Sequence, residues 1–218
     1  MKKLKKFYEG KKVLVTGGAG FIGSHLVEKL VELGARVTVL DNFSSGKIHN
    51  LKKILQRITI IYSDVSFDHV GLKATHSQDI VFHLAAMVSV PQSIKYPDLC
   101  EKINVQGTKN LLNGCVKNHV GTLILSSSCA IYGNKFGPCC ESDLPSPLSP
   151  YAQSKLSAEI LCQKYSQDFS LKTACLRYFN VYGDRQNFNG DYAAVIAKFK
   201  YNLENNLPIT VFGDRMEP

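Results

Sequence analysis

Tyr151 and Lys155 stand four residues apart in the segment SPLSPYAQSK, directly after a proline. On a helix that follows Pro150, this spacing places both side chains on one face. Tyrosine can act as a general base, but its unperturbed pKa of about 10 is too high at neutral pH. A neighbouring ammonium group favours the phenolate and lowers that pKa. The pair therefore fits proton abstraction, although the same spacing also arises by chance in many helices.

A glycine-rich segment, VTGGAGFIGS, carries Gly17, Gly20 and Gly23 between an apolar run and a helical pattern. Glycines there let the backbone approach a pyrophosphate, whose charge is stabilised at the helix N-terminus. Asp41 ends the next apolar run, where a carboxylate can bind both ribose hydroxyls of NAD and repel the 2′-phosphate of NADP. The segment therefore predicts an NAD site; a strand-end turn residue is the alternative for Asp41.

Apolar runs alternate with helical patterns over most of the chain, which predicts an α/β fold. We expect a Rossmann-type, doubly wound parallel sheet with helices on both faces. The expected strands are 11–17, 35–41, 58–65, 79–86, 122–128, 172–181 and a short 208–213. The expected helices are 21–34, 47–55, 97–119, 151–169 and 192–205. The expected organisation is a basic tail (1–10), an NAD-binding domain (11–181) and the incomplete beginning of a small C-terminal substrate domain (182–218).

The composition is that of an ordinary globular protein, with 44% hydrophobic and 20% charged residues. No apolar run is long enough for a membrane span, and the lysine-rich start lacks the apolar stretch of a signal peptide. Six lysines and one glutamate in the first twelve residues account for five of the eight net positive charges, which favours a solvated tail over a nucleic-acid surface. The seven cysteines lack metal-ligand spacing, so we expect reduced thiols, no metal site and a cytoplasmic protein.

Two further polar segments end predicted strands, at the sheet edge where ligands bind in this architecture. His83 begins HLAA after the fourth strand, and the serine triplet of LSSSCAIYG ends the fifth. Alone, the histidine fits a structural role and the triplet a polar strand end. Together with the glycine loop and the Tyr151–Lys155 pair, they predict one combined site.

In this order, the motifs resemble the extended short-chain dehydrogenases/reductases, specifically the NAD-dependent nucleotide-sugar epimerase/dehydratase family. The resemblance extends from about Lys11 to Asp214. Its matching stretches are VTGGAGFIGSHLVEKL, VLDNFSSG, DVSF, VFHLAAMVSVPQSI, INVQGTKNLL, SSSCAIYG, PLSPYAQSKLSAE, RYFNVYGDRQ and PITVFGD.

The resemblance implies a catalytic group of Ser128, Tyr151 and Lys155, with Ser127 assisting. Tyr151 would take a proton from a sugar hydroxyl while hydride leaves that carbon for NAD, and the ketosugar would take the hydride back on its other face. Lys155 would also hold the nicotinamide ribose, and its charge together with that of the positive nicotinamide ring would lower the pKa of Tyr151. The implied cofactor contacts are Gly17, Gly20, Phe21, Ile22, Gly23, Asp41, Asn42, Asp64, Val65, Leu84, Ala85, Ala86, Asn104, Tyr151 and Lys155. The implied substrate contacts are Ser89, Ser93, Ser127, Ser128 and Asn180.

Some of these residues have more specific implied roles. Asp64 and Val65 match a pair that caps the adenine, and Asn104 matches a residue that supports the active-site helix. Asn180 matches an asparagine that holds the substrate diphosphate, with a strand-end turn residue as an equally good interpretation.

Dehydratases of the family carry an acidic pair where this chain has Cys129 and Ala130, so dehydration is disfavoured. The closest resemblance is to UDP-sugar 4-epimerases acting on UDP-glucose/UDP-galactose or UDP-GlcNAc/UDP-GalNAc. The alternatives are another epimerase or dehydratase of the family, or an NAD-binding module without turnover. The family also implies a homodimer through the helices 97–119 and 151–169.

Two departures from the family pattern stand out. Asp184 replaces a usual proline in a turn, and the sequence stops at VFGDRMEP, before the arginine-containing segment that grips the substrate diphosphate. We therefore expect a fragment, or a prematurely ended chain, that binds NAD and turns over UDP-sugar poorly or not at all.

Overall fold

The computed structural model describes residues 2–186 and 195–209. The chain divides into two compact units, Met1–Phe179 and Asn180–Pro218. The first unit contains the whole sheet. The predicted assignment of residues 182–218 to a substrate domain stays a prediction.

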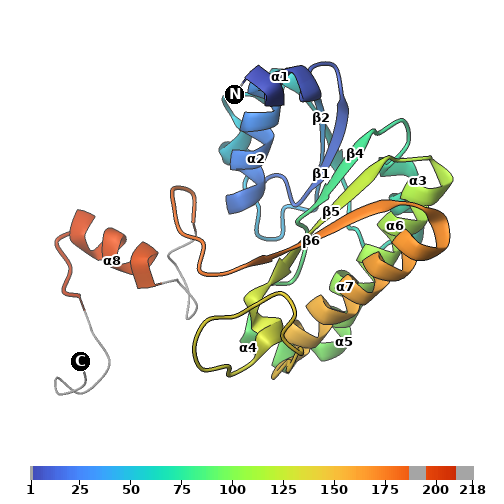
Figure 1. Ribbon diagram of the computed structural model, residues 1–218. Helices are drawn as coiled ribbons and strands as arrows, with labels where there is room; N and C mark the ends of the chain where they lie inside the picture. Colours follow the sequence, from blue (N-terminus) through green and yellow to red (C-terminus); the bar gives the residue numbers. More distant parts are fainter. Residues whose placement is uncertain (1, 187–194, 210–218) are drawn as a thin grey trace. The chain divides into compact units, whose positions relative to one another are not determined.

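Six parallel strands form one sheet in the order β3-β2-β1-β4-β5-β6 (Figure 1). The chain winds outward from β1 to β3, returns to the other side of β1, and continues outward to β6. This arrangement confirms the predicted doubly wound sheet, and it brings the carboxyl ends of all six strands to one edge. The strands are β1 (Lys12–Thr16), β2 (Arg36–Asp41), β3 (Ile58–Tyr62), β4 (Ile80–His83), β5 (Thr122–Ser128) and β6 (Lys172–Tyr178).

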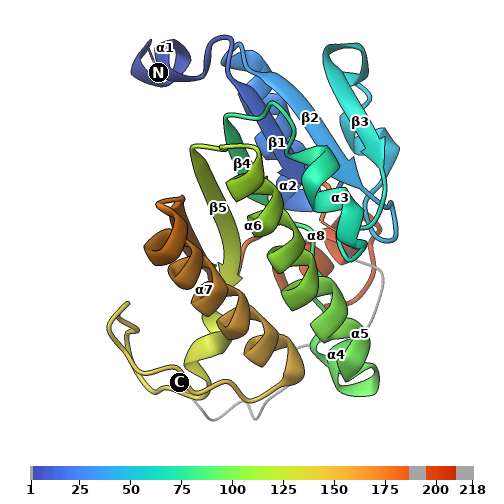
Figure 2. The same ribbon diagram turned by 90° about the vertical axis from the view of Figure 1, so that its right-hand side faces the viewer.

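Helices cover both faces of this sheet because the central strands are apolar on both sides. α2 packs against β1 and β2, while α3, α6 and α7 lie on the opposite face (Figure 2). The buried side chains accordingly form two clusters, one on each face. The helices of the first unit are α1 (Lys2–Tyr8), α2 (Phe21–Glu32), α3 (Asp68–Ala74), α4 (Val90–Lys95), α5 (Pro97–Glu101), α6 (Gly107–Lys117) and α7 (Pro150–Phe169).

The predicted helix 97–119 is not a single regular helix. It consists of α5, a π-helical segment over Lys102–Gln106, and α6. Within the π-helical segment the side chain of Asn104 bonds to other elements, and the Thr108 hydroxyl donates to the Asn104 carbonyl. Such side-chain bonds accompany local departures from the regular helical ladder.

Other predicted elements shift as well. The predicted helix 47–55 is wrong, since two 3-10 turns, Ile48–Leu51 and Leu55–Arg57, occupy this segment. The short helices α3 and α4 lack a long periodic pattern, and sequence inspection missed both. The basic tail contains α1, which has no buried residue.

The predicted helix 192–205 corresponds to α8 (Val195–Glu204) in the second unit, with residues 192–194 outside the described residues. Most of the predicted strand 208–213 also lies outside them. No helix in residues 2–186 or 195–209 is long and apolar enough to cross a membrane. All seven cysteines fall within the described residues, and each is a free thiol.

Candidate active site

The glycine loop between β1 and α2 is packed so tightly that two of its glycines have no room for a side chain. Gly17 has a φ of +68°, and a Cβ on it would lie 2.7 Å from the backbone nitrogen of Ala85. A Cβ on Gly23 would lie 2.1 Å from the carbonyl oxygen of Gly17. Both neighbours are backbone atoms and cannot rotate away. The loop is therefore specified by close approach of the backbone.

Gly20 differs from these two glycines because its surroundings are open. A Cβ there would meet only the Gly17 carbonyl oxygen, at 3.2 Å, within a 4 Å radius. Gly20 is also the N-cap of α2, and within the described residues no side chain caps this helix end. The first backbone N–H groups of α2 are therefore available to an anion. Phe21 and Ile22, the first two residues of α2, are both partly buried.

Asp41 ends β2 beside this loop, as the sequence predicts. One carboxylate oxygen accepts a hydrogen bond from Ala19 N–H at 2.9 Å, and the other accepts one from Phe43 N–H at 2.8 Å. Each oxygen keeps a further lone pair for a ligand hydroxyl. Asp41 thus orders the glycine loop as well as presenting a carboxylate at the sheet edge.

Asn42 and Asp64 lie next to each other at the ends of β2 and β3. The amide of Asn42 donates to Asp64 at 2.6 Å, and Ser66 N–H donates to the other Asp64 oxygen at 2.8 Å. Partial burial alone would raise the pKa of Asp64, but these bonds and the charge of Lys102 lower it overall. The carboxylate is therefore ionised. The Val65 side chain, by contrast, is buried in the core.

Ser128, Tyr151 and Lys155 come together where β5 meets α7. The Ser128 hydroxyl lies near enough to the Tyr151 phenol to lower its pKa, and the Lys155 ammonium lies 5.9 Å from the centre of the Tyr151 ring. Lys155 donates to the carbonyl oxygen of Ser126 at 2.8 Å, which holds its long side chain against β5. The predicted catalytic group is thus one cluster of side chains, although Pro150 at the start of α7 comes 22 positions after Ser128.

Burial dominates the electrostatics of this cluster. It raises the pKa of Tyr151, and the nearby Ser128 hydroxyl only partly offsets the rise. Burial also lowers the pKa of Lys155 to about 8. The predicted lowering of the Tyr151 pKa by Lys155 and the nicotinamide ring together concerns the site with NAD bound, and it stays a prediction.

Local sequence explains why α7 begins at this point. The Ser149 hydroxyl accepts a bond from Ala152 N–H at 3.1 Å as an N-cap, and Pro150 occupies the first helical position. The Ser93 hydroxyl accepts a bond from Tyr151 N–H at 3.1 Å and donates to Val90 O at 2.7 Å. The first turn of α7 is therefore held from two sides.

Two of the predicted substrate serines have structural contacts instead of open positions. Ser93 is fully buried, with its hydroxyl engaged by α7, which favours a positioning role over direct contact with substrate. Ser89 is the N-cap of α4 and accepts a bond from Gln92 N–H at 3.3 Å. Ser89 is only partly buried, so its assignment stays a prediction.

Asn104 has no free amide hydrogen for a cofactor. Its Nδ2 donates to Met87 O at 3.0 Å and to Ser154 Oγ at 2.9 Å, while its Oδ1 accepts from Met87 N–H at 2.8 Å. Asn104 therefore supports α7 and the segment after β4, as one of its two predicted roles required. The geometry does not favour the other role, direct contact with the cofactor.

The remaining residues that the sequence predicts for the site lie in three different parts of the chain. Leu84, Ala85 and Ala86 follow β4 beside the glycine loop, and all three are partly exposed. Ser127 is buried, and its hydroxyl has no partner among the described residues. Asn180, the first residue of the second unit, stays a prediction.

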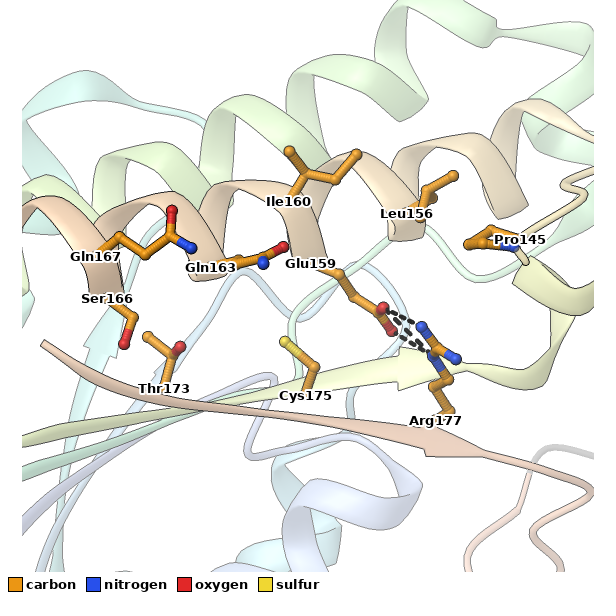
Figure 3. Close-up of a pocket in the computed structure, with 10 residues that line it drawn as sticks. All are labelled: Pro145, Leu156, Glu159, Ile160, Gln163, Ser166, Gln167, Thr173, Cys175 and Arg177. Carbon is orange, nitrogen blue, oxygen red and sulfur yellow. Dashed lines mark hydrogen bonds and ion pairs between the residues drawn. The ribbon is translucent and has the colours of Figure 1, made fainter. Parts of the chain in front are cut away.

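Sequence reasoning missed an ion pair beside this cluster. Arg177 on β6 bonds to Glu159 on α7, with 2.8 Å between Nη2 and Oε2, and its Nη1 donates to the Tyr132 hydroxyl at 2.9 Å. Figure 3 shows this pair at one end of a groove of about 700 Å³ between α7 and β6. None of the three clustered residues lines the groove. The arginine in RYFN was the available sequence signal, but its partner is 18 positions away.

No group of three or more His, Cys, Asp or Glu side chains within the described parts of the chain could hold a metal ion. The site therefore consists of a backbone cradle, a carboxylate at the sheet edge, and a Ser-Tyr-Lys cluster. This set can hold an anionic, hydroxyl-bearing ligand and exchange a proton with it.

Most of the chain matches a known protein family. Residues 13–217 match the family model described as the NAD dependent epimerase/dehydratase family. A UDP-glucose 4-epimerase of Mycolicibacterium smegmatis is 35% identical over 208 residues, which cover 93% of this chain and 66% of that protein. The chain thus spans slightly less than two thirds of the length of this relative.

Solved structures give the same result. A UDP-N-acetylglucosamine 4-epimerase from Methanobrevibacter ruminantium, in complex with UDP-N-acetylmuramic acid, is 41% identical with a TM-score of 0.90, covering 94% of this chain and 66% of that one. A UDP-glucose 4-epimerase of Thermus thermophilus, in complex with NAD, is 39% identical with a TM-score of 0.83, covering 92% and 65%. Both likenesses cover more than nine tenths of this chain.

Proposed function

Because the chain belongs to the NAD dependent epimerase/dehydratase family, we propose that it binds NAD and inverts C4 of a UDP-sugar through a 4-keto intermediate. The substrate pair is UDP-glucose and UDP-galactose, or UDP-GlcNAc and UDP-GalNAc. One observation carries the proposal: Ser128, Tyr151 and Lys155 form one cluster at the same sheet edge as the glycine loop and Asp41.

The residues at this edge fit NAD. The open side of Gly20 and the uncapped start of α2 suit the pyrophosphate, and Asp41 suits the adenosine ribose. The hydrogen-bonded pair of Asn42 and Asp64 borders the adenine end. When bound, NAD supplies a hydride acceptor that later returns the hydride.

The cluster supplies the proton chemistry. Tyr151 removes the proton from the C4 hydroxyl, and Ser128, which lies beside the phenol, holds that hydroxyl and relays the proton. Burial raises the pKa of Tyr151, so the phenolate needs positive charge nearby in the loaded site. Lys155 provides part of this charge and a donor for the nicotinamide ribose.

Epimerisation is favoured over dehydration by the residues after Ser128. Expelling the C6 hydroxyl as water needs a carboxylic acid close to the sugar. Cys129 and Ala130 occupy that segment, and burial raises the pKa of the Cys129 thiol. A neutral thiol and a methyl group are poor proton donors, so the keto intermediate has only the route back to a 4-hydroxyl.

The test is product identification. The chain is incubated with NAD and either UDP-glucose or UDP-GlcNAc, and the sugar product is identified by NMR, with Tyr151→Phe as the inactive control. We expect the C4 epimer. A 4-keto-6-deoxy sugar would replace the proposal by dehydration, and full activity in the Tyr151→Phe variant would show that the catalytic centre is misplaced.

The chain spans about two thirds of its relatives, so binding is tested separately from turnover. Calorimetric titrations with NAD and with UDP-glucose measure the two affinities. Binding of NAD without binding of the UDP-sugar would assign this chain as an NAD-binding module instead.

We also propose a homodimer in the cytoplasm. α5 and α6 pack against α7, and these helices leave large apolar side chains exposed, including Leu99 and Ile160. Two copies would cover them in a four-helix interface. Monomers at high concentration in sedimentation equilibrium would contradict the dimer.

The free thiols fit a reducing compartment, which cell fractionation can test.

A further inference from the structure

We propose that His83 is a positioning residue that ties the backbone beside the glycine loop to the helix carrying Tyr151 and Lys155. One continuous chain of buried hydrogen bonds makes this connection. The inference rests on the function proposed above, because it concerns how the NAD side and the catalytic side of one site are held together.

On the NAD side, the histidine reaches the last residue of β1. His83 Nδ1 lies 2.7 Å from Oγ1 of Thr16, and the same oxygen accepts a bond from Ala85 N–H at 3.2 Å. Ala85 is the residue whose backbone nitrogen would lie 2.7 Å from a Cβ on Gly17. The imidazole therefore orients the hydroxyl that sets the backbone against the glycine loop.

On the catalytic side, the chain of bonds passes through the π-helical segment. His83 Nε2 lies 3.0 Å from Oγ1 of Thr108, whose hydroxyl donates to Asn104 O at 2.5 Å. The Asn104 amide donates to Ser154 Oγ at 2.9 Å, and Ser154 donates to Tyr151 O at 2.7 Å. The connection thus ends on the backbone of the base itself.

Only one arrangement of protons satisfies the donors and acceptors in this series of hydrogen bonds. The Thr108 hydrogen is used toward Asn104, so Nε2 of His83 must carry a hydrogen and donate it to Thr108. Nδ1 is then an acceptor for the Thr16 hydroxyl, whose oxygen remains free to accept from Ala85 N–H. The bonds of His83 to Thr16 and Thr108, and that of Thr108 to Asn104, are buried away from water.

A charged ring would break this arrangement, because Nδ1 could no longer accept. Burial lowers the pKa of His83 to about 3, with a further contribution from the charge of Lys155. The ring is therefore neutral at physiological pH, which suits a fixed link and excludes a role as a proton donor to substrate. The π-helical turn lies where the chain of bonds crosses from β4 to α7, and such turns are frequent at functional sites.

Thr108→Val cuts the chain of bonds at its middle with little change of volume. Among the described residues Thr108 makes no hydrogen bond to the glycine loop itself, and its route to the Ala85 backbone beside that loop runs through His83 and Thr16. Thr75→Val is the matched control, because Thr75 is equally buried and its hydroxyl also donates to a helix carbonyl, Gly71 O at 2.8 Å, far along the chain from the site. Both variants should lose thermal stability.

Calorimetry with NAD separates the two variants. We expect Thr108→Val to weaken NAD binding roughly 2- to 30-fold, the range of indirect couplings, and Thr75→Val to bind as the wild-type chain does. Equal affinities for the two variants would overturn the proposal.

NMR provides a readout that needs no cofactor. The ring nitrogens of His83 should show protonated Nε2 and unprotonated Nδ1 at neutral pH, and the opposite tautomer would overturn the proposal. Thr108→Val should shift the amide resonance of Ala85. Thr16→Val should shift the amide resonance of Ser154. Thr75→Val should shift neither resonance. If the wild-type chain does not bind NAD, the proposed function fails, but the NMR test of the hydrogen-bonded link still applies. If Thr108→Val then leaves the Ala85 amide resonance unshifted, the link through His83 fails as well.

Discussion

The glycine loop and the Ser128–Tyr151–Lys155 cluster lie at the same edge of the sheet, but backbone forms the first and side chains form the second. At Gly17 and Gly23, other backbone atoms occupy the space where a side chain would begin. In the cluster, burial controls the behaviour of Tyr151 and Lys155 by disfavouring their charged forms. Substitutions in the loop should therefore act through steric overlap, and substitutions in the cluster through charge and pH.

The largest effect is expected in the loop, from Gly23→Ala. Its Cβ would overlap the Gly17 carbonyl, so we expect a loss of about 3 kcal/mol in the free energy of unfolding, or failure to fold. Gly20→Ala is the matched variant, since its Cβ meets that carbonyl only at 3.2 Å. It should fold and bind NAD more weakly. Denaturant unfolding and calorimetry measure both; equal stability of the two variants would show that the loop is not limited by backbone overlap.

In the cluster, Lys155→Met should change how stability depends on pH. The pKa of Lys155 in the folded chain, about 8, lies below its ordinary value of 10.5. Between these two pH values the folded chain therefore binds fewer protons than the unfolded chain does. As pH rises from 8 to 10.5, the free energy of unfolding of the wild-type chain should increase by up to about 3 kcal/mol. The variant lacks this gain. Denaturant unfolding near pH 8 and near pH 10.5 measures the free energy of unfolding of the wild-type chain and of the variant. If the difference between the two chains were the same at both pH values, the result would contradict a buried, charged Lys155.

A smaller effect is expected at Asp41, whose side-chain carboxylate accepts a hydrogen bond from the backbone of the glycine loop. Asp41→Ala should weaken NAD binding roughly 10- to 100-fold by removing charge-assisted hydrogen bonds, and reduce the preference for NAD over NADP. Asp79→Ala is the control, because Asp79 accepts a backbone bond from Lys12 at 2.9 Å at the opposite end of β1. Unchanged affinities for both cofactors in Asp41→Ala would refute the ribose assignment.

The same contrast explains what could be predicted from the sequence. The glycine loop, Asp41 and the start of α7 are local patterns, in which turn geometry, a strand end and a Ser-Pro cap lie within a few residues. Six strands with long apolar runs were equally visible, so the sheet was predicted correctly.

Features that depend on distant contacts could not be predicted. The π-helical turn around Asn104 depends on Met87 and Ser154, and the burial of Ser93 depends on the placement of α4 against α7. The burial that raises the pKa of Tyr151 in the chain alone could not be predicted either, because spacing shows which charges are near but not how much water is excluded. The links made by His83 and Arg177 join residues from different strands and helices, and a single residue type in a motif does not reveal such partners.

The most direct measurement of the central claim is the near-ultraviolet absorbance of reduced nicotinamide after a UDP-sugar is mixed with the NAD-loaded chain. If Tyr151 is the base that the cluster positions, the wild-type chain should show this absorbance, and Tyr151→Phe should show it at a rate roughly 100- to 10,000-fold lower while binding NAD normally. Equal rates in the wild-type and Tyr151→Phe chains would contradict the assignment of the Ser128–Tyr151–Lys155 cluster as the catalytic centre.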